Sequence, residues 1–365
     1  STQGYSSAAS DVYKRQVFIP VVALTLMGSL FSFITAVCVT ISSIKITAKG
    51  GNLIWRYIVM KMVFAFVLKF LEDFWGQFLN DVNFFKEHRF YIPTTTLLYW
   101  SHTLDDVGFF SWFVPLLVYL FSKIPRLDYR HCMVIFTVLG IVLLQFNDVT
   151  IEYCIKLGEW FESHEFYFFY YLTTKLDNGA FAILQYIPFG MFGAAFGLLF
   201  SHTNDFKQYW TYCAILSVIC FAFGIPNLLN DYKTFVTAVF GWIKPKSYLF
   251  FMGAIQSIAM LICMHLADNP KRPVEKRYRT VRRTTFLRRI NVLSLTAYIF
   301  EPRYNRTVLM FYKLLFGEGA DRQQEICLWS WHVVLLYMLL CTVLWAFICC
   351  LLYTSPSPRD GLLSR

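Results

Sequence analysis

Charged side chains are scarce in this chain of 365 residues. Asp, Glu, Lys and Arg together make up 15% of it, whereas about 25% is usual for soluble globular domains. Apolar residues make up 57% and aromatic residues 19%. The sequence also lacks a glycine-rich phosphate loop and a low-complexity linker. This composition excludes an ordinary soluble domain and gives no support to a nucleotide-binding enzyme.

The ten cysteines show no Cys-x-x-Cys pair and no regular spacing with histidine. Structural zinc sites and dithiol redox sites depend on such spacing. Most of the cysteines lie inside apolar stretches, where a free thiol behaves as a small apolar side chain. We therefore expect no metal site and no disulfide framework.

Long apolar stretches are abundant instead. Several run for about 20 residues with almost no charge, which is long enough to cross a hydrocarbon layer of about 30 Å. The sequence predicts an all-α fold, a polytopic transmembrane helical bundle embedded in the lipid bilayer. We expect about nine crossings, at residues 17–44, 54–78, 107–122, 132–146, 181–200, 209–229, 248–266, 290–311 and 326–349.

The two ends of the chain are predicted to be foreign to the protein. Residues 6–16, SSAASDVYKRQ, back-translate to an adapter used in transposase-based sequencing libraries, and residues 350–360, CLLYTSPSPRD, back-translate to the adapter of the opposite end. Such segments are left out of fold prediction. We expect residues 1–16 and 350–365 to be translated adapter, and residues 17–349 to be a single transmembrane domain truncated at both ends.

Charge in the connections predicts the orientation. Nine alternating crossings place residues 45–56, 122–130, 201–207 and 268–289 on one side, and together these connections are strongly basic. Nine Lys and Arg residues lie between Lys271 and Arg289, whereas residues 147–178 on the other side carry six acids and two lysines. Because basic connections stay in the cytoplasm, we expect the fragment to begin outside. The Lys271–Arg289 loop is expected to contact anionic headgroups rather than nucleic acid.

The crossing predicted at residues 54–78 carries an unusual stripe of charge. Lys61, Ala65, Lys69 and Asp73 are four residues apart and so lie on one face of a helix, with Glu72 beside them. A lysine in mid-membrane costs about 2.5–3.5 kcal/mol, and each large apolar residue returns only about 0.3–0.6 kcal/mol. We expect this stripe to turn inward. It is either a functional site or an internal Lys69–Asp73 ion pair that only stabilises the fold.

Other residues are weaker candidates for a binding, catalytic or packing role. Arg56 and Lys61 extend the stripe toward the cytoplasm, where they could hold a phosphorylated ligand. His102, followed by Asp105 and Asp106, could act as a general base, although an exposed loop is the plainer interpretation. In FGMFGAAFG, the small residues Gly190, Gly193 and Gly197 favour close helix packing.

Several segments resemble the integral-membrane acyltransferase superfamily, which includes heparan-α-glucosaminide N-acetyltransferase and cell-surface O-acetyltransferases. PVVALTLMGSLFSF, with Pro20 and Gly28, followed by RYIVMK, is similar to the second and third helices of that family. YIPFGMFGAAFGLLF resembles its glycine-rich central helix. RRINVLSLTAYIFEP resembles a late helix and matches its pattern at Ser294, Leu295 and Tyr298, but Asn291 stands where Gly is usual and Glu301 where His or Gln is usual.

The resemblance implies transfer of an acyl group, most often acetyl, from cytoplasmic acyl-CoA to a hydroxyl or amine of a small-molecule or glycan acceptor outside. It implies that Arg56 and Lys61 hold the CoA phosphates and that Lys69 or Tyr298 polarises the thioester carbonyl. The family's catalytic His lies on a helix that would precede this fragment. Two other functions remain open: a secondary transporter that uses the Lys69, Glu72 and Asp73 stripe, and a structural membrane subunit.

Overall fold

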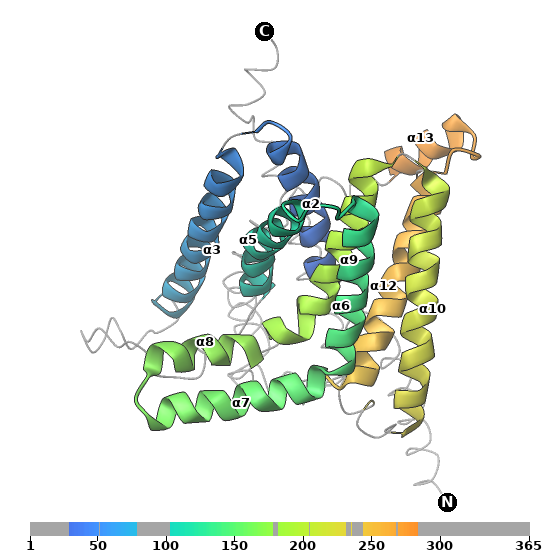
Figure 1. The fold of residues 1–365 in the computed structure, drawn as a ribbon. Helices are drawn as coiled ribbons and strands as arrows, with labels where there is room; N and C mark the ends of the chain where they lie inside the picture. Colours follow the sequence, from blue (N-terminus) through green and yellow to red (C-terminus); the bar gives the residue numbers. More distant parts are fainter. Residues whose placement is uncertain are drawn as a thin grey trace, which may run out of the picture. The chain divides into compact units, whose positions relative to one another are not determined.

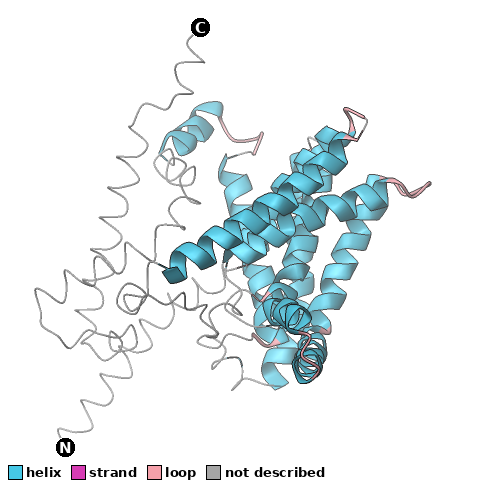
Figure 2. Ribbon diagram, turned by 90° about the vertical axis from the view of Figure 1, so that its left-hand side faces the viewer, coloured by secondary structure: helices cyan, strands magenta, loops and turns pink. Residues whose placement is uncertain are grey.

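The computed structural model describes residues 29–50, 52–78, 103–177, 182–203, 205–230, 235, 244–267 and 269–283. Helices and their connecting loops and turns account for all of these residues (Figure 2). The prediction of an all-α fold is therefore confirmed for the described part of the chain. The chain divides into two compact units, residues 1–270 and 271–365, which are described separately below.

The described helices have clear bounds (Figure 1). Those of the first unit are α2 (Leu30–Thr47), α3 (Leu53–Phe78), α5 (Thr103–Ser122), α6 (Tyr129–Gln145), α7 (Asn147–Ser163), α8 (Tyr167–Asp177), α9 (Ile183–His202), α10 (Phe206–Asn230) and α12 (Lys246–Ala267). In the second unit, α13 (Val274–Arg283) is short and strongly basic.

Five of these helices, α2, α5, α9, α10 and α12, are long and apolar enough to cross a membrane. A sixth span results if α6 and α7, which meet at a bend of 69°, are counted together. The 26 residues of α3 suffice for a crossing, but α3 is not among these spans because five charged residues interrupt its apolar sequence. Nine crossings therefore stay a prediction, and those at residues 290–311 and 326–349 lie outside the described residues.

Helix α9 lies at the centre of the first unit, with most of its side chains buried. It packs on α2 along glycines that leave room for the neighbouring backbone. A Cβ atom at Gly193 would collide with the carbonyl oxygen of Phe33 and lie 2.8 Å from the Cβ of Ala36, and one at Gly197 would lie 2.8 Å from the Cβ of Thr40. Because residue numbers rise together along this contact, α2 and α9 run parallel.

Helix α3 packs on α5 and runs antiparallel to it. The rings of Trp55 and Tyr119 are 5.3 Å apart near one end of the pair. Further along, a Cβ atom at Gly108 would lie 3.1 Å from the Cβ of Ala65. Ala65 belongs to the same helical stripe as Lys61 and Lys69, so this stripe of α3 includes the line of contact with α5.

Helices α7 and α8 form a hairpin that lies across the direction of α6 (Figure 1). Its exposed side chains include many large aromatic residues, namely Tyr153, Trp160, Phe166, Tyr167, Phe168 and Phe169. Aromatic side chains that are exposed together in this way are typical of the membrane–water interface. The hairpin therefore has the surface expected of a segment at the membrane–water interface.

Candidate functional site

A buried polar cluster lies near the first turns of α2 and α5. Asp106 on α5 is 0% exposed, and its Oδ2 accepts a hydrogen bond from the hydroxyl of Ser32 on α2. Oδ1 of Asp106 has no hydrogen-bond partner among the described residues. This part of the first unit is called the Asp106 end below.

An ion pair joins the same region to the interfacial hairpin. The ammonium nitrogen of Lys175, near the end of α8, lies 3.6 Å from Oδ2 of Asp105, and both side chains are only 8% exposed. The ammonium group also lies 5.5 Å from the centre of the Tyr171 ring. Lys175 therefore balances one of two adjacent acidic residues, Asp105 and Asp106.

Two more contacts tie α12 and α9 to this end of the unit. Ser29, just before α2, donates a hydrogen bond of 2.6 Å to Oε1 of Gln256 on α12. Gln185 on α9 is also fully buried, and its Oε1 accepts a hydrogen bond of 2.8 Å from the backbone nitrogen of Lys244. The Asp106 cluster is defined here as Ser29, Ser32, Asp105, Asp106, Lys175 and Gln256.

The chemistry open to this cluster follows from its burial. Removing a charged carboxylate from water costs several kcal/mol unless donors surround it. Asp106 receives one donated hydrogen bond from the described residues, so its second oxygen can take up a proton or meet a further donor. Asp105 and Lys175 can hold opposite charges next to it. The arrangement suits proton transfer, or stabilisation of charge on a bound group.

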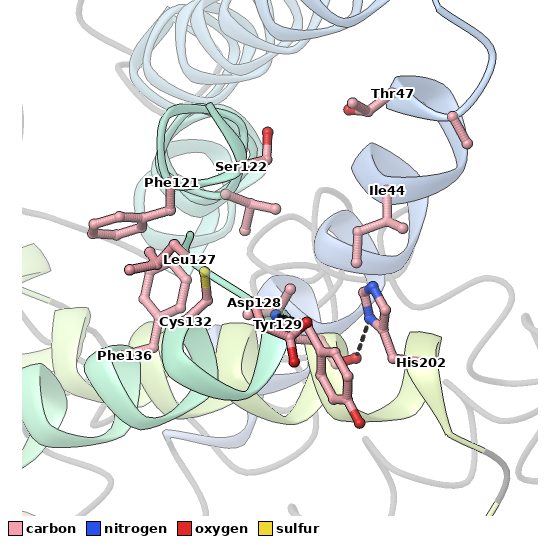
Figure 3. A pocket seen from close by; sticks show the side chains of 13 residues that line it. Ile44, Thr47, Phe121, Ser122, Leu127, Asp128, Tyr129, Cys132, Phe136 and His202 are labelled. Atoms are coloured by element: carbon pink, nitrogen blue, oxygen red, sulfur yellow. Dashed lines mark hydrogen bonds between the residues drawn. The ribbon is translucent and has the colours of Figure 1, made fainter. Parts of the chain in front are cut away.

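The opposite end of the same helices encloses a pocket of about 360 Å³ (Figure 3). It lies among the last turns of α2, α5 and α9 and the first turns of α6. Its lining is largely apolar and includes a few polar side chains. The residues that line it are Ile44, Thr47, Ala48, Val118, Phe121, Ser122, Leu127, Asp128, Tyr129, Cys132, Phe136, Leu198 and His202. This part of the first unit is called the His202 end below.

His202 is held in a defined orientation at this pocket. Its ring stacks on Tyr129, with the centroids 4.5 Å apart and the planes 4° from parallel. Nδ1 lies 2.9 Å from the carbonyl oxygen of Leu198, and Figure 3 shows the imidazole turned toward Ile44. Because a carbonyl only accepts hydrogen bonds, Nδ1 carries the proton, and Nε2 of the neutral ring keeps its lone pair.

Basic residues gather at the His202 end. Arg56, in the first turn of α3, is exposed and follows Trp55, which contacts Tyr119 on α5. The ammonium group of Lys123, one residue beyond α5, lies 5.1 Å from the centre of the same Tyr119 ring. The Arg56 predicted to hold CoA phosphates therefore lies at the same end of the unit as the pocket.

The other predicted site residues are distributed unevenly. Asp105 belongs to the Asp106 cluster. Lys61 is half-buried, and its ammonium group lies over the rings of Tyr57 and Phe64 on its own helix. Lys69, Glu72 and Asp73 lie on α3, but their side chains are outside the described residues, as are His102 and Tyr298. Gly190 lies against the ring of Phe110, and Gly193 and Gly197 lie against α2.

Ser32, Lys175, Gln256 and His202 are site residues that the sequence does not predict. Lys175 could have been noticed, because it is one of two lysines in a strongly acidic segment. Ser32 and Gln256 are single polar residues in apolar helices, and such residues are common at helix contacts. No feature of the sequence distinguishes His202 from the other histidines.

Among the described residues, no group of three or more His, Cys, Asp or Glu side chains is arranged to hold a metal ion. No family model matches the chain, and neither curated proteins nor solved structures give a match to it.

Proposed function

We propose that this chain is the transmembrane domain of an acyltransferase. It moves an acyl group, most often acetyl, from cytoplasmic acyl-CoA to a hydroxyl or amine of a small-molecule or glycan acceptor on the other side. The observation that carries the proposal is that α2 and α5 each contribute to both candidate sites. Ser32 and Asp106 lie at one end of these helices, and Ile44 and Phe121 lie at the pocket at the other end.

The proposed orientation places the His202 end in the cytoplasm. The exposed basic residues Lys49, Arg56 and Lys123 lie at that end of the first unit, and basic connections are retained on the cytoplasmic side. The Asp106 end and the α7–α8 hairpin then lie outside. Nine crossings complete this topology, and the segment from Lys271 to Arg289 lies along anionic headgroups.

In the proposed reaction, the acceptor's oxygen or nitrogen attacks the thioester carbonyl carbon. A new C–O or C–N bond forms, the C–S bond breaks, and the acceptor's proton passes through a base to the departing thiolate. His102 with Asp105, or a histidine on a preceding helix, supplies the base. Lys69 or Tyr298 stabilises the negative charge on the carbonyl oxygen. Arg56 and Lys61 hold the CoA phosphates.

The first measurement is to sequence the source DNA across both predicted adapter junctions. An additional apolar helix before residue 17, with a histidine toward its outer end, supports the proposal. Several helices that mirror residues 17–78 contradict it and favour a transporter. The recovered gene also supplies the protein for the activity assay.

The assay uses that protein in vesicles, with radiolabelled acetyl-CoA supplied to the His202 end and glucosamine or glucose as acceptor at the other end. Asp105→Asn is expected to lower the rate of labelled product formation by about a hundredfold, as expected for a group that supports a general base. Glu152→Gln is the matched control, because Glu152 forms an exposed pair with Lys156. Equal rates for both variants contradict the role of Asp105.

A secondary transporter is the second candidate, and one observation favours it. Oδ1 of Asp106 is fully buried among spanning helices and has no hydrogen-bond partner among the described residues, so a coupling proton can bind there. In the same vesicles, a proton-coupled transporter changes the interior pH when substrate is added, and Asp106→Asn abolishes the change. If neither activity is found and loss of charge at both Lys69 and Asp73 is tolerated, a structural subunit is the remaining candidate.

A further inference from the structure

A second, larger hollow lies on the side of the first unit between α6 and α10. Its volume is about 670 Å³, which is within the range of pockets that hold small ligands. Helix α6 packs mainly on α9, and α10 packs mainly on α12, so the two helices leave a groove between them. Leu199 of α9 contributes to the lining behind them. The groove and the His202 pocket have no lining residue in common.

The two helices begin at the same end of the unit and run in the same direction. Tyr129 at the start of α6 stacks on His202, and α10 starts only four residues after His202. The α10 side of the groove extends from Lys207 to Ile219. At 1.5 Å per residue this is about 18 Å, close to the roughly 15 Å of hydrocarbon in one leaflet.

The groove changes from polar to apolar along this length. Lys207, Gln208 and Thr211 line it at the start of α10. Farther along, it is lined by aliphatic side chains from both helices, namely Val138, Ile141, Ile215, Leu216 and Ile219. A membrane lipid has the same order of groups, with a polar headgroup followed by an acyl chain.

The two hydroxyl groups within the apolar part are already engaged. Thr137 Oγ1 donates to the carbonyl oxygen of Met133 and lies 3.2 Å from the hydroxyl of Tyr212. The Tyr212 hydroxyl also lies 3.3 Å from the carbonyl oxygen of Phe192, to which it donates. Since these groups are satisfied within the protein, the wall presents a hydrocarbon surface that suits an acyl chain.

The charge at the polar end selects the headgroup. Lys207 is exposed and is the charged residue that lines the groove. The nearby acid Asp205 accepts a hydrogen bond of 2.9 Å from the backbone nitrogen of Lys207 and so caps the start of α10. A lysine ammonium group attracts an anionic headgroup more strongly than a zwitterionic one.

We propose that the groove between α6 and α10 binds one anionic glycerophospholipid from the leaflet at the His202 end. An acyl chain lies between Val138 and Ile215, and the headgroup phosphate contacts Lys207. This site is independent of the proposed acyl transfer, since its residues belong to neither candidate reaction site.

The test reconstitutes the full chain in vesicles of equal parts phosphatidylglycerol and phosphatidylcholine, extracts it in mild detergent and measures the retained lipid by mass spectrometry. We expect phosphatidylglycerol to be retained about fivefold over phosphatidylcholine. Lys207→Gln removes this preference, and Ile215→Trp, which fills the groove, removes the retained lipid itself.

Two matched controls accompany these variants. Lys123→Gln removes a cation from the same end of the unit, and Val218→Trp adds the same ring to an exposed position of α10 that does not line the groove. Both are expected to retain phosphatidylglycerol as the parent does. Equal retention of the two lipids, no retained lipid in the parent, or the same loss in Val218→Trp as in Ile215→Trp would each overturn the proposal.

Discussion

The Asp106 end and the His202 end of the first unit are built largely from the same helices, yet they place polar groups in opposite ways. At the Asp106 end, two acids and a lysine are almost completely removed from solvent. At the His202 end, the pocket is mostly apolar, while the basic residues around it are exposed. Charge is thus buried at one end and kept at the surface at the other.

The difference indicates where each end can do chemistry. A buried ion pair is held by low-dielectric surroundings and is costly to break, so the Asp106 cluster is suited to a fixed, charged reaction site. Exposed cations interact with ligands weakly and reversibly. The His202 end is therefore suited to the entry and release of a phosphorylated ligand.

The largest effect is expected from breaking the buried pair. Lys175→Ala removes a cationic partner of the buried Asp105 side chain, and we expect a loss of about 3–5 kcal/mol in the free energy of unfolding. Unfolding in detergent, followed by tryptophan fluorescence, measures it. Lys156→Ala removes the exposed partner of Glu152 and should change stability little. If the two variants lose the same stability, the Asp106 end is no more sensitive to charge than the surface.

The next prediction concerns the packing of α9 against its neighbouring helices, between the two ends of the unit. Gly193→Ala places a Cβ atom against the backbone carbonyl of Phe33, which cannot move aside, and we expect a loss of about 1–3 kcal/mol. At Gly190 the neighbour is the Phe110 ring, a side chain that can turn. Thermal unfolding should therefore rank Gly193→Ala below Gly190→Ala in stability. The reverse order would contradict the close approach of α2 and α9.

The free energy of unfolding is expected to depend on pH through Asp177, which lies in the α7–α8 hairpin. Burial raises the pKa of Asp177 on α8 from 3.8 to about 6, partly offset by its hydrogen bond with Cys154. Because the folded protein then binds this proton more tightly than the unfolded chain, the stabilisation is complete below about pH 4 and is lost as the pH rises through 6. It amounts to about 2 kcal/mol or less.

Unfolding measured at several pH values between 4 and 7 tests this dependence. Asp177→Asn should remove the fall in stability over that interval while leaving the rest of the profile in place. If stability falls with pH in Asp177→Asn as it does in the parent, another group is responsible for the pH dependence.

The smallest effect is expected at the open pocket. His202→Ala removes the ring stacked on Tyr129, and such aromatic pairs are worth about 0.5–1.5 kcal/mol. A double-mutant cycle with Tyr129→Leu measures the coupling directly. A loss of stability as large as that in Lys175→Ala would show that the His202 end contributes to the core. That result would contradict the contrast between a buried Asp106 end and an exposed His202 end.

Much of the fold could be predicted from the sequence. Apolar stretches of about 20 residues indicated the spanning helices, and α5, α9, α10 and α12 each lie within a few residues of a predicted crossing. The crossing predicted at residues 132–146 ends where α6 meets α7, whereas the bend of 69° at that point is not predicted by the sequence. The inward orientation of the charged stripe of α3 stays a prediction, because the side chains of Lys69, Glu72 and Asp73 lie outside the described residues.

The candidate site was less accessible to sequence reasoning. The sequence predicts a role for Asp105 because it lies near His102, whereas the structure joins it to Lys175, which is 70 residues away in the chain. Ser32 and Asp106 are separated by 74 residues, and Ser29 and Gln256 by 227. A sequence pattern reports neighbours within one helix, and contacts between helices depend on their rotation and register.

The helical character of the described residues and the ability of several helices to cross a membrane follow from the sequence, because length and apolarity are properties of each segment alone. Which polar residues are buried together and which line a pocket depends on how the helices pack. Burial depends on the neighbours that a helix acquires, and the small residues of α9 set those neighbours by allowing α2 to approach it closely.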